Sequence, residues 1–231
     1  MSKGIQARGV TRLNKMLSAA VKLFLENGYE RTTTTAIARA AGMSPSSFFA
    51  AFETKEELLL VLVQKMFGDQ FDNAARMLGQ NTDPLMLYCV ETTLQMHIVE
   101  LSEPLREIYV MAYSLPTTSD YIYLKTSQKL ETIFADYLPN AQEKDFYELE
   151  IASAGITRGF MAKHTDLYFT MEQKLRRYLD CCLTLYHVPE ERRSAAIAAV
   201  LRMDLRSAAE KIISDISQKA NEGFASMMSE N

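Results

Sequence analysis

The chain has 231 residues, of which 48% are hydrophobic and 23% charged, with only nine glycines and six prolines. So few turn-forming residues exclude an all-β sandwich or barrel, which needs a turn every ~8–12 residues. No apolar run approaches the ~18 residues of a membrane span, and the first nine residues lack the apolar core of a signal peptide. The three cysteines include an adjacent pair and indicate no disulfide framework. We therefore expect a cytoplasmic protein without a membrane partner.

The formal net charge of −4 is distributed unevenly along the chain. Residues 1–52 contain seven basic and two acidic side chains, a balance of +5, which leaves −9 for the remainder. A cationic N-terminal segment on an anionic body suggests that only this segment meets a polyanion.

Apolar residues recur about every 3.6 positions between the prolines, and no stretch alternates convincingly as a strand. Three of the prolines follow a residue that can cap a helix, which is typical of a helix start. The expected helices include residues 14–27, 55–80, 84–101, 104–113, 143–164, 171–187 and 189–217. The sequence thus predicts an all-α protein of about nine or ten helices, whose body is one compact bundle.

A helix followed by a tight turn is expected early in the chain. Thr33 suits the N-cap of a short helix whose Ile37, Ala38 and Ala41 pack inward. Gly42 suits the left-handed position that ends this helix.

A second short helix should follow the turn. Ser44 is expected to cap it and Pro45 to begin it. Phe48, Phe49 and Phe52 are expected to be buried against neighbouring helices, which would fix the orientation of the helix while its other face stays polar. Two helices joined in this way form a helix-turn-helix, whose second helix reads DNA in the major groove.

The fixed-spacing residues of this region carry a family resemblance. They are Ala19, Ala20, Leu23, Phe24, Gly28, Tyr29, Thr32, Thr33, Ile37, Ala38, residues 40–44, Phe48, Phe49, Phe52 and residues 55–58. Over roughly residues 12–62 they resemble the N-terminal domain of the TetR family of bacterial transcriptional regulators. The resemblance implies a three-helix DNA-binding domain over residues 1–54 and a larger helical ligand-binding and dimerisation domain over residues 55–231.

The recognition helix departs from the family pattern. Ser46 stands where a small residue, often glycine, is usual, and Phe49 stands where a tyrosine often contacts a phosphate. Ala50 and Ala51 replace larger side chains, and Pro45 replaces a basic residue. With few long hydrogen-bonding side chains, we expect thymine-methyl contacts and DNA shape to carry more of the specificity.

The expected DNA contacts follow from the motif and the resemblance. Ser46 and Ser47 should reach base edges, whereas Thr33, Thr34 and Lys55 should contact phosphates. Thr34 also suits helix capping, and Lys55 also suits the solvated start of a helix. The full set of expected contacts is Thr33, Thr34, Ser44, Pro45, Ser46, Ser47, Phe49 and Lys55.

The resemblance implies a homodimeric repressor that binds a double-stranded DNA operator and is released by a small apolar or aromatic ligand. One alternative is an architectural or division-control DNA-binding protein without an inducer, and another is a helical binding module that no longer reads DNA. No catalytic motif is present in the sequence, so neither an enzyme nor a cofactor is expected.

We expect the ligand between the helices predicted at residues 55–80, 84–101 and 104–113. The candidate lining residues are Met66, Met96, His97, Tyr109 and Tyr113. His97 also suits a satisfied core histidine. A ligand held there would tilt the first of these helices and change the spacing of the two recognition helices.

Gly155 and Gly159 give the helix at residues 143–164 a smooth face that suits either a dimer seam or a tight internal crossing. The second helix of the seam would be residues 171–187 or 189–217. The histidines and cysteines have no zinc-site spacing, so no metal is expected.

Overall fold

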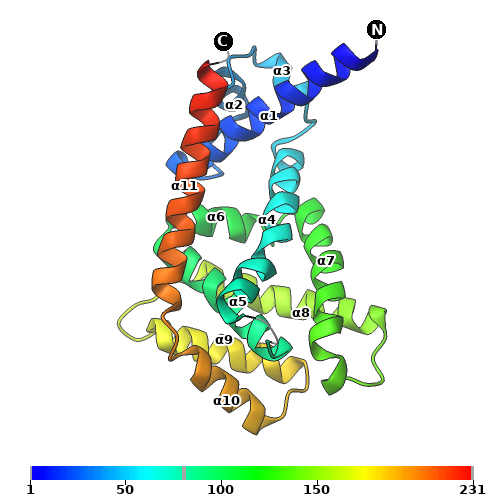
Figure 1. Cartoon of the computed structure of the whole chain (residues 1–231), viewed down its shortest axis with the longest axis vertical. Helices are drawn as coiled ribbons and strands as arrows, with labels where there is room; N and C mark the ends of the chain where they lie inside the picture. Colours follow the sequence, from blue (N-terminus) through cyan, green and yellow to red (C-terminus); the bar gives the residue numbers. More distant parts are fainter. Residues whose placement is uncertain (1, 80–81, 230–231) are drawn as a thin grey trace.

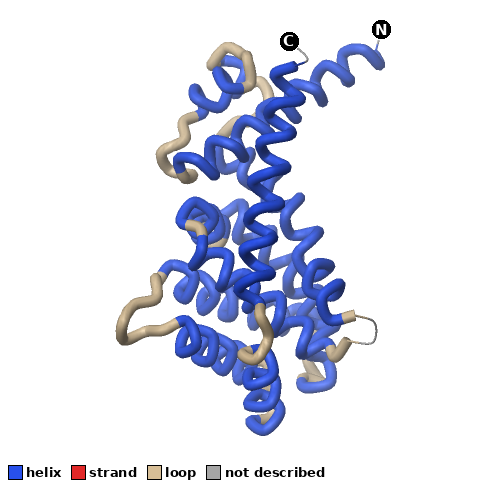
Figure 2. Tube along the Cα trace, turned by 60° about the vertical axis from the view of Figure 1, so that its left-hand side comes forward, coloured by secondary structure: helices blue, strands red, loops and turns tan. Residues whose placement is uncertain are grey.

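The computed structural model describes residues 2–79 and 82–229, and within these ranges it has eleven α-helices, one 3-10 turn and no strand (Figure 1; Figure 2). Side chains at residues 2–10, 66–70, 73 and 224–229 lie outside the description. None of the described helices combines the length and hydropathy needed to cross a bilayer. The elements are α1 (Ser2–Asn27), α2 (Thr34–Ala40), α3 (Ser46–Phe49), α4 (Lys55–Leu78), α5 (Pro84–Leu101), α6 (Glu103–Ala112), α7 (Pro116–Phe134), η1 (Ala135–Tyr137), α8 (Glu143–Ala162), α9 (Met171–Leu185), α10 (Glu190–Val200) and α11 (Leu205–Ser229). The predicted all-α fold is confirmed.

Local capping groups explain why several helices begin where the sequence suggests. The Thr54 hydroxyl accepts a hydrogen bond from the backbone N–H of Glu57 at 3.0 Å, which caps α4. The Asp83 carboxylate accepts one from Leu85 N–H at 3.0 Å, and Pro84 occupies the first turn of α5. These side chains satisfy N–H groups that have no partner inside the helix.

The prediction of one continuous helix over residues 189–217 is wrong in two respects. The segment is divided into α10 and α11 by a turn at residues 201–204, and α11 continues to Ser229. In the turn, the Asp204 carboxylate accepts a hydrogen bond from the backbone N–H of Ser207 at 3.2 Å, in the manner of an N-cap. This local cap interrupts an apolar pattern that periodicity alone reads as continuous, and it adds to the number of helices.

The helices place α1–α3 at one end of the molecule and α9 and α10 at the other (Figure 1). Helix α4 runs from the first end into the body, where it packs on α5 and α7. Helix α11 is a second connection, because it lies along both α5 in the body and α1 at the end. This second connection could not be expected from the sequence alone.

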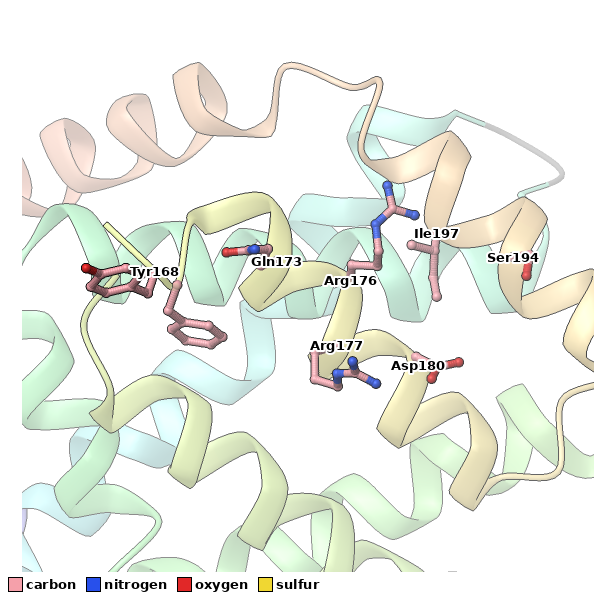
Figure 3. A pocket seen from close by; sticks show the side chains of 8 residues that line it. Tyr168, Gln173, Arg176, Arg177, Asp180, Ser194 and Ile197 are labelled. Atoms are coloured by element: carbon pink, nitrogen blue, oxygen red, sulfur yellow. The ribbon is translucent and has the colours of Figure 1, made fainter. Parts of the chain in front are cut away.

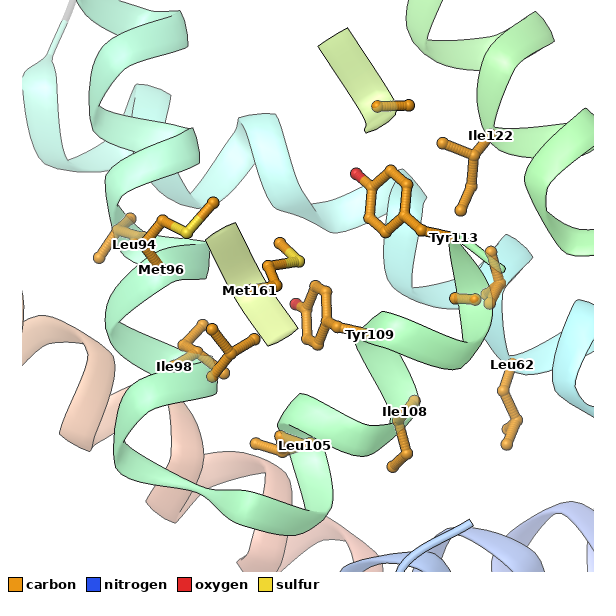
Figure 4. Packing of buried hydrophobic residues seen from close by; sticks show 14 of the residues in the cluster. Leu62, Leu94, Met96, Ile98, Leu105, Ile108, Tyr109, Tyr113, Ile122 and Met161 are labelled. Atoms are coloured by element: carbon orange, nitrogen blue, oxygen red, sulfur yellow. The ribbon is translucent and has the colours of Figure 1, made fainter. Parts of the chain in front are cut away.

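Helix α5 is the centre of the body, and most of its residues are buried. It contacts α4, α6, α7, α8, α9, α10 and α11. Figure 4 shows the packing beside it, where Tyr109 of α6 lies next to Met161 of α8, with Met96 of α5 close by. All three side chains are buried, which fixes α6 between the body and the α1–α3 end.

Candidate functional site

The turn between α2 and α3 has the geometry predicted for it. The Thr33 hydroxyl accepts a hydrogen bond from Ala36 N–H at 3.1 Å and caps α2. Gly42 has a φ of 72°, and the N–H of Met43 reaches the carbonyl of Ala38 at 2.9 Å. A left-handed glycine followed by this backward bond is the Schellman arrangement that ends a helix sharply.

The start of α3 differs from the prediction by one residue. Helix α3 begins at Ser46, with Pro45 as its N-cap residue, and no side chain caps it. The Ser44 hydroxyl instead bonds the hydroxyls of Ser46 at 3.0 Å and Ser47 at 2.9 Å. Ser44 is therefore not the predicted cap, because its hydroxyl is engaged by two other hydroxyls at the start of the helix.

The prediction that three phenylalanine rings are buried is wrong for Phe49. Phe48 and Phe52 are 0% and 2% exposed, whereas Phe49 is 62% exposed. Residues four apart share one face of a helix, and the next residue is turned about 100° away. The ring of Phe49 therefore lies on the outer surface of α3, edge-on to Phe48.

Lys55 has structural partners that the sequence did not reveal. Its ammonium donates to the backbone carbonyls of Tyr29 at 2.8 Å and Thr32 at 3.0 Å, and it lies 4.2 Å from the centre of the Tyr29 ring. Burial lowers the pKa of Lys55, while Glu107 and Glu30 act against that shift. Lys55 thus holds the loop between α1 and α2 against the start of α4.

The predicted DNA contacts all lie at the α2, α3 and α4 junction. Thr33, Ser44, Pro45, Ser46 and Phe49 are exposed, and Thr34, Ser47 and Lys55 are partly buried. Their contact with DNA stays a prediction.

A small cavity of about 20 Å³ lies in the body. Its lining residues are Phe71 of α4, Tyr88, Glu91, Thr92 and Gln95 of α5, Tyr113 at the end of α6, Thr126 of α7, Glu150, Ser153 and Thr157 of α8, and Tyr178 of α9. This volume holds about one water molecule, so an organic ligand enters only if lining side chains move.

Two carboxyl groups dominate the chemistry of the cavity. Glu91 and Glu150 are each 3% exposed. Gln95 donates its amide to Glu91, and Ser153 donates its hydroxyl to Glu150 at 2.6 Å. Burial raises the pKa of Glu91 to about 7 and that of Glu150 to about 8. Both groups therefore take up protons near neutral pH, unlike exposed carboxylates.

The structure brings together only part of the predicted ligand set. Tyr113 lines the cavity, while Met96 and Tyr109 are buried in the packing beside it (Figure 4). His97 instead lines a separate groove of about 460 Å³ among α5, α9, α10 and α11, since adjacent helical residues point about 100° apart. The side chain of Met66 lies outside the described residues.

Sequence reasoning missed the two glutamates. Glu91 is the one charged residue between positions 84 and 99, in a helix that is apolar around its whole circumference. A lone charge in such a helix is a signal that could have been used. Glu150 gave no comparable signal, because its neighbours Glu148 and Asp145 make it look like part of a solvated helix face.

A second groove lies outside the body, between α9, α10 and the loop before α9 (Figure 3). It has a volume of about 510 Å³, and Arg176, Arg177 and Asp180 line it together with Tyr168. Tyr168 is 88% exposed. This groove is much larger than the body cavity of about 20 Å³, and its lining contains two arginines. Among the described residues, no group of three or more His, Cys, Asp or Glu side chains is arranged to hold a metal ion.

Residues 16–62 match the model of bacterial regulatory proteins of the tetR family. The regulator TcmR of Streptomyces glaucescens is 40% identical over 58 residues, which are 25% of this chain and 26% of TcmR. The regulator HbdR of Aromatoleum sp. (strain CIB) is 28% identical over 102 residues, 44% of this chain and 43% of HbdR. The family-model match spans the helix-turn-helix, and both relatives are named HTH-type transcriptional regulators.

YvkB of Bacillus subtilis (strain 168), an uncharacterized HTH-type transcriptional regulator, is 26% identical over 162 residues, 68% of this chain and 77% of YvkB. Among solved structures, RolR in complex with the ligand resorcinol matches with a TM-score of 0.65 and 12% identity, over 86% of this chain and 97% of RolR. At that identity the match shows a shared fold. The chain spans 26% of TcmR and 43% of HbdR, so these relatives support chiefly the N-terminal part.

Proposed function

Because the chain is a transcriptional regulator of the TetR family, we propose that it is a homodimeric repressor that acts in the cytoplasm and leaves its operator when a small aromatic molecule enters the body cavity. The observation that carries the proposal is the α2–α3 helix-turn-helix, with its Schellman turn and exposed outer surface. It stands at the cationic end of an otherwise anionic chain.

Helix α3 enters the major groove in this proposal. Ser46 and Ser47 meet base edges there, and the exposed ring of Phe49 contacts thymine methyl groups or sugars. Thr33 and Thr34, at the start of α2, contact phosphates, as N–H groups and hydroxyls at a helix start commonly do. Lys55 adds charge beside the same backbone while it supports the α1–α2 loop.

Helix α8 supplies the dimer seam. Gly155 and Gly159 are exposed, and a Cβ added at either position would meet no atom within 4 Å. This openness argues against the tight internal crossing and favours a surface for a second copy. Ile151, 44% exposed, extends the same region with apolar surface. A two-fold arrangement of α8, with α9 beside it, would bring two recognition helices to one DNA duplex.

The cavity is the proposed effector site. Its aromatic walls suit a small ring, and its polar groups favour a ring with hydrogen-bond donors over a purely apolar ligand. RolR, which has the same fold, was solved with resorcinol, an aromatic molecule with two hydroxyl groups. Entry must displace Phe71 of α4 or Tyr113 at the end of α6, and both helices lead to the α1–α3 end. A coupling of ~1–3 kcal/mol would be ordinary for such a switch.

One observation favours the alternative of an architectural DNA-binding protein without an inducer. The cavity volume of about 20 Å³ accommodates no organic molecule unless the lining moves. Under this alternative, the body would serve dimerisation alone.

The test begins with selection of binding sites from random duplexes, followed by fluorescence anisotropy across a salt series. We expect sequence-selective, salt-dependent binding. Resorcinol, 2-phenylethylamine and 2-phenylethanol are then titrated with and without saturating operator. At least one should bind more weakly in the presence of operator, by the same factor by which it weakens DNA binding. Selective DNA binding that none of the three alters would favour the architectural alternative.

The dimer is tested separately by light scattering. Gly159→Arg places a long charged side chain on the proposed seam and should give a monomeric mass and weaker operator binding. Gln128→Arg, on an exposed position of α7, is the matched control and should leave the dimer intact. A wild-type chain that is monomeric at micromolar concentration would overturn the dimer proposal.

A further inference from the structure

The body cavity contains two buried carboxyl groups and no basic side chain among its described lining residues. Glu91 reaches the cavity from α5 and Glu150 from α8, and the charge on Glu91 raises the pKa of Glu150. The hydrogen-bond partners described for the two carboxyls are neutral: Gln95 for Glu91, and Ser153 and Tyr186 for Glu150. A buried carboxylate without a cation is costly, so this pair lacks the partner that would stabilise its ionised form.

The other lining groups suit a cation with an aromatic body. The rings of Phe71, Tyr88, Tyr113 and Tyr178 form walls on several sides of the cavity. The faces of aromatic rings attract cations, most strongly where water is excluded. Thr126 adds a hydroxyl oxygen that is inaccessible to solvent and has no hydrogen-bond partner in the structure. This oxygen is an unused acceptor at the same cavity.

We propose that the effector of this cavity is a small aromatic amine, bound as its protonated cation with the ammonium group between Glu91 and Glu150. This inference rests on the proposed function, because it names the chemical class of ligand for that site. An ammonium group has three donors, which match two carboxyl groups and one hydroxyl. A neutral ring with hydroxyl groups would supply no positive charge to stabilise an ionised carboxylate here, so both carboxyls would stay protonated.

Binding of an ammonium ligand should release a proton to the solvent, whereas binding of a neutral ligand should not. At about pH 6, below both raised pKa values, the empty cavity holds carboxyl groups that are largely protonated, as their burial favours. The incoming ammonium ion ionises one of them, an ion pair forms, and the displaced proton passes to the solvent. One cation therefore enters and about one proton leaves, so the net charge inside the cavity stays close to zero.

The position of the amine also explains how it would act on the DNA-binding end. A ring too large for the cavity displaces Phe71, which α4 carries, while its ammonium group is held by α5 and α8. The ammonium group of Lys129, an exposed residue of α7, lies 5.4 Å from the centre of the Phe71 ring. Movement of Phe71 therefore changes a contact between α4 and α7 as well as the position of α4.

The experiment compares 2-phenylethylamine with 2-phenylethanol, which has nearly the same shape but no charge. Both are titrated into the full chain by calorimetry at about pH 6, where both carboxyls are largely protonated, in phosphate and in Bis-Tris buffer. We expect the amine to bind at least about tenfold more tightly and to release about one proton, read from the difference in heat between buffers. Equal affinities, absence of amine binding, or amine binding without proton release would overturn the inference.

Variants add a second readout. Glu91→Gln and Glu150→Gln should each weaken amine binding by about tenfold and reduce proton release, while binding of the alcohol is unchanged. Glu148→Gln, an exposed position on α8, is the matched control and should change neither. Thermal melts establish that each variant folds, and the wild-type comparison of the two probes holds even if a variant does not.

Failure of the amine inference can be distinguished from failure of the proposed repressor function. If resorcinol or 2-phenylethanol releases the operator and the amine does not, the repressor proposal stands and the amine inference is wrong. If the amine binds with proton release but leaves operator affinity unchanged, the cavity recognises a cation without controlling DNA binding.

Discussion

The carboxylate of Glu107, on α6, accepts a hydrogen bond from the backbone N–H of Glu30 at 2.5 Å. This contact joins the body to the loop between α1 and α2. The same helix ends beside Tyr113, which lines the cavity. The C-terminus of α6 therefore reaches the proposed effector site through Tyr113. Glu107, within the same helix, bonds the loop between α1 and α2. A displacement of Tyr113 has a direct mechanical route to the α1–α2 loop.

Removal of this hydrogen bond should weaken the coupling between effector and operator. Glu107→Ala loses a charge-assisted bond worth about 1–3 kcal/mol, and α6 then moves without pulling on the loop. We expect the effector to lower operator affinity several-fold less than in the wild type, as measured by anisotropy. Glu103→Ala, on the same helix, removes an exposed carboxylate and is the matched control. Equal coupling in both variants would exclude Glu107 from the route.

Gly28 should not tolerate a side chain. Its φ of +82° is a conformation that other residues adopt at a cost, and a Cβ would collide with the carboxylate of Glu107. Gly28→Ala should therefore lower the free energy of unfolding by about 1–3 kcal/mol in urea denaturation. Gly223→Ala, in α11, meets only an ordinary contact with Ser18 at 3.6 Å and should be neutral or slightly stabilising. Similar losses in both variants would contradict this reading of Gly28.

Lys55 should contribute to stability whether or not it contacts DNA. Lys55→Ala leaves the carbonyls of Tyr29 and Thr32 without their donor, so we expect a loss of about 1–3 kcal/mol in urea denaturation. If Lys55 also meets a phosphate, the slope of log affinity against log salt should flatten by about one for each half-site. Lys65→Ala, exposed on the same helix, is the control for both measurements. An unchanged slope with reduced stability would assign Lys55 a purely structural role.

The two buried carboxyls should make the protein less stable as the pH rises. Their ordinary pKa is 4.5, and burial raises it to about 7 in Glu91 and about 8 in Glu150. Between these values the folded chain binds more protons than the unfolded chain. The free energy of unfolding therefore falls through this window, by about 1.4 kcal/mol per pH unit for each group, and levels off above it.

Urea denaturation between about pH 5.5 and 8.5 measures this slope, and Glu91→Gln with Glu150→Gln should flatten it. The titratable groups that face the pair are Tyr88, Tyr113, Tyr178, Cys182 and Tyr186, and burial raises the pKa of each above its ordinary value, that of Cys182 to about 12. They do not titrate in the window. Glu100, with a pKa of about 2, acts only at lower pH and with the opposite sign. A slope that survives both substitutions would place its origin elsewhere.

The ion pair of Lys174 and Glu100 should be a strong structural contact. The Lys174 side chain is fully buried, and its ammonium donates to Glu100 at 2.9 Å and to the carbonyl of Lys163 at 2.7 Å. Glu100 also accepts from the N–H and hydroxyl of Thr165, which ties the loop before α9 to α5. Lys174→Met should cost about 3–5 kcal/mol in urea denaturation, because Glu100 loses its cation.

Replacement of both Lys174 and Glu100 tests why Lys174→Met should lower the free energy of unfolding. Lys174→Met combined with Glu100→Gln should recover part of the stability, since no uncompensated charge remains. Arg176→Met, on an exposed position of the same helix, is the control and should be close to neutral. A double variant less stable than Lys174→Met alone would contradict the electrostatic explanation.

Short-range chemistry allowed the helix-turn-helix to be predicted from the sequence. Thr33 caps α2 through a neighbour three residues away, Gly42 ends it through its own φ, and Pro84 begins α5. These features depend on groups within one helical turn, so they can be read without knowledge of the rest of the chain. For the same reason, the all-α class and the residues of the recognition helix followed from spacing and resemblance.

Tertiary structure decided the features that depend on which helices meet. Glu91 and Glu150 are 59 positions apart, and only the packing of α5 against α8 brings them to one cavity. The partners of Lys55 and the contact between Glu107 and Glu30 likewise join segments that local periodicity treats as unrelated. Phe49 is exposed because its neighbours four residues apart occupy the buried face of α3. Periodicity assigns a face to a residue, but the charge and the carbonyl groups opposite that face belong to other helices, so only the packed fold determines them.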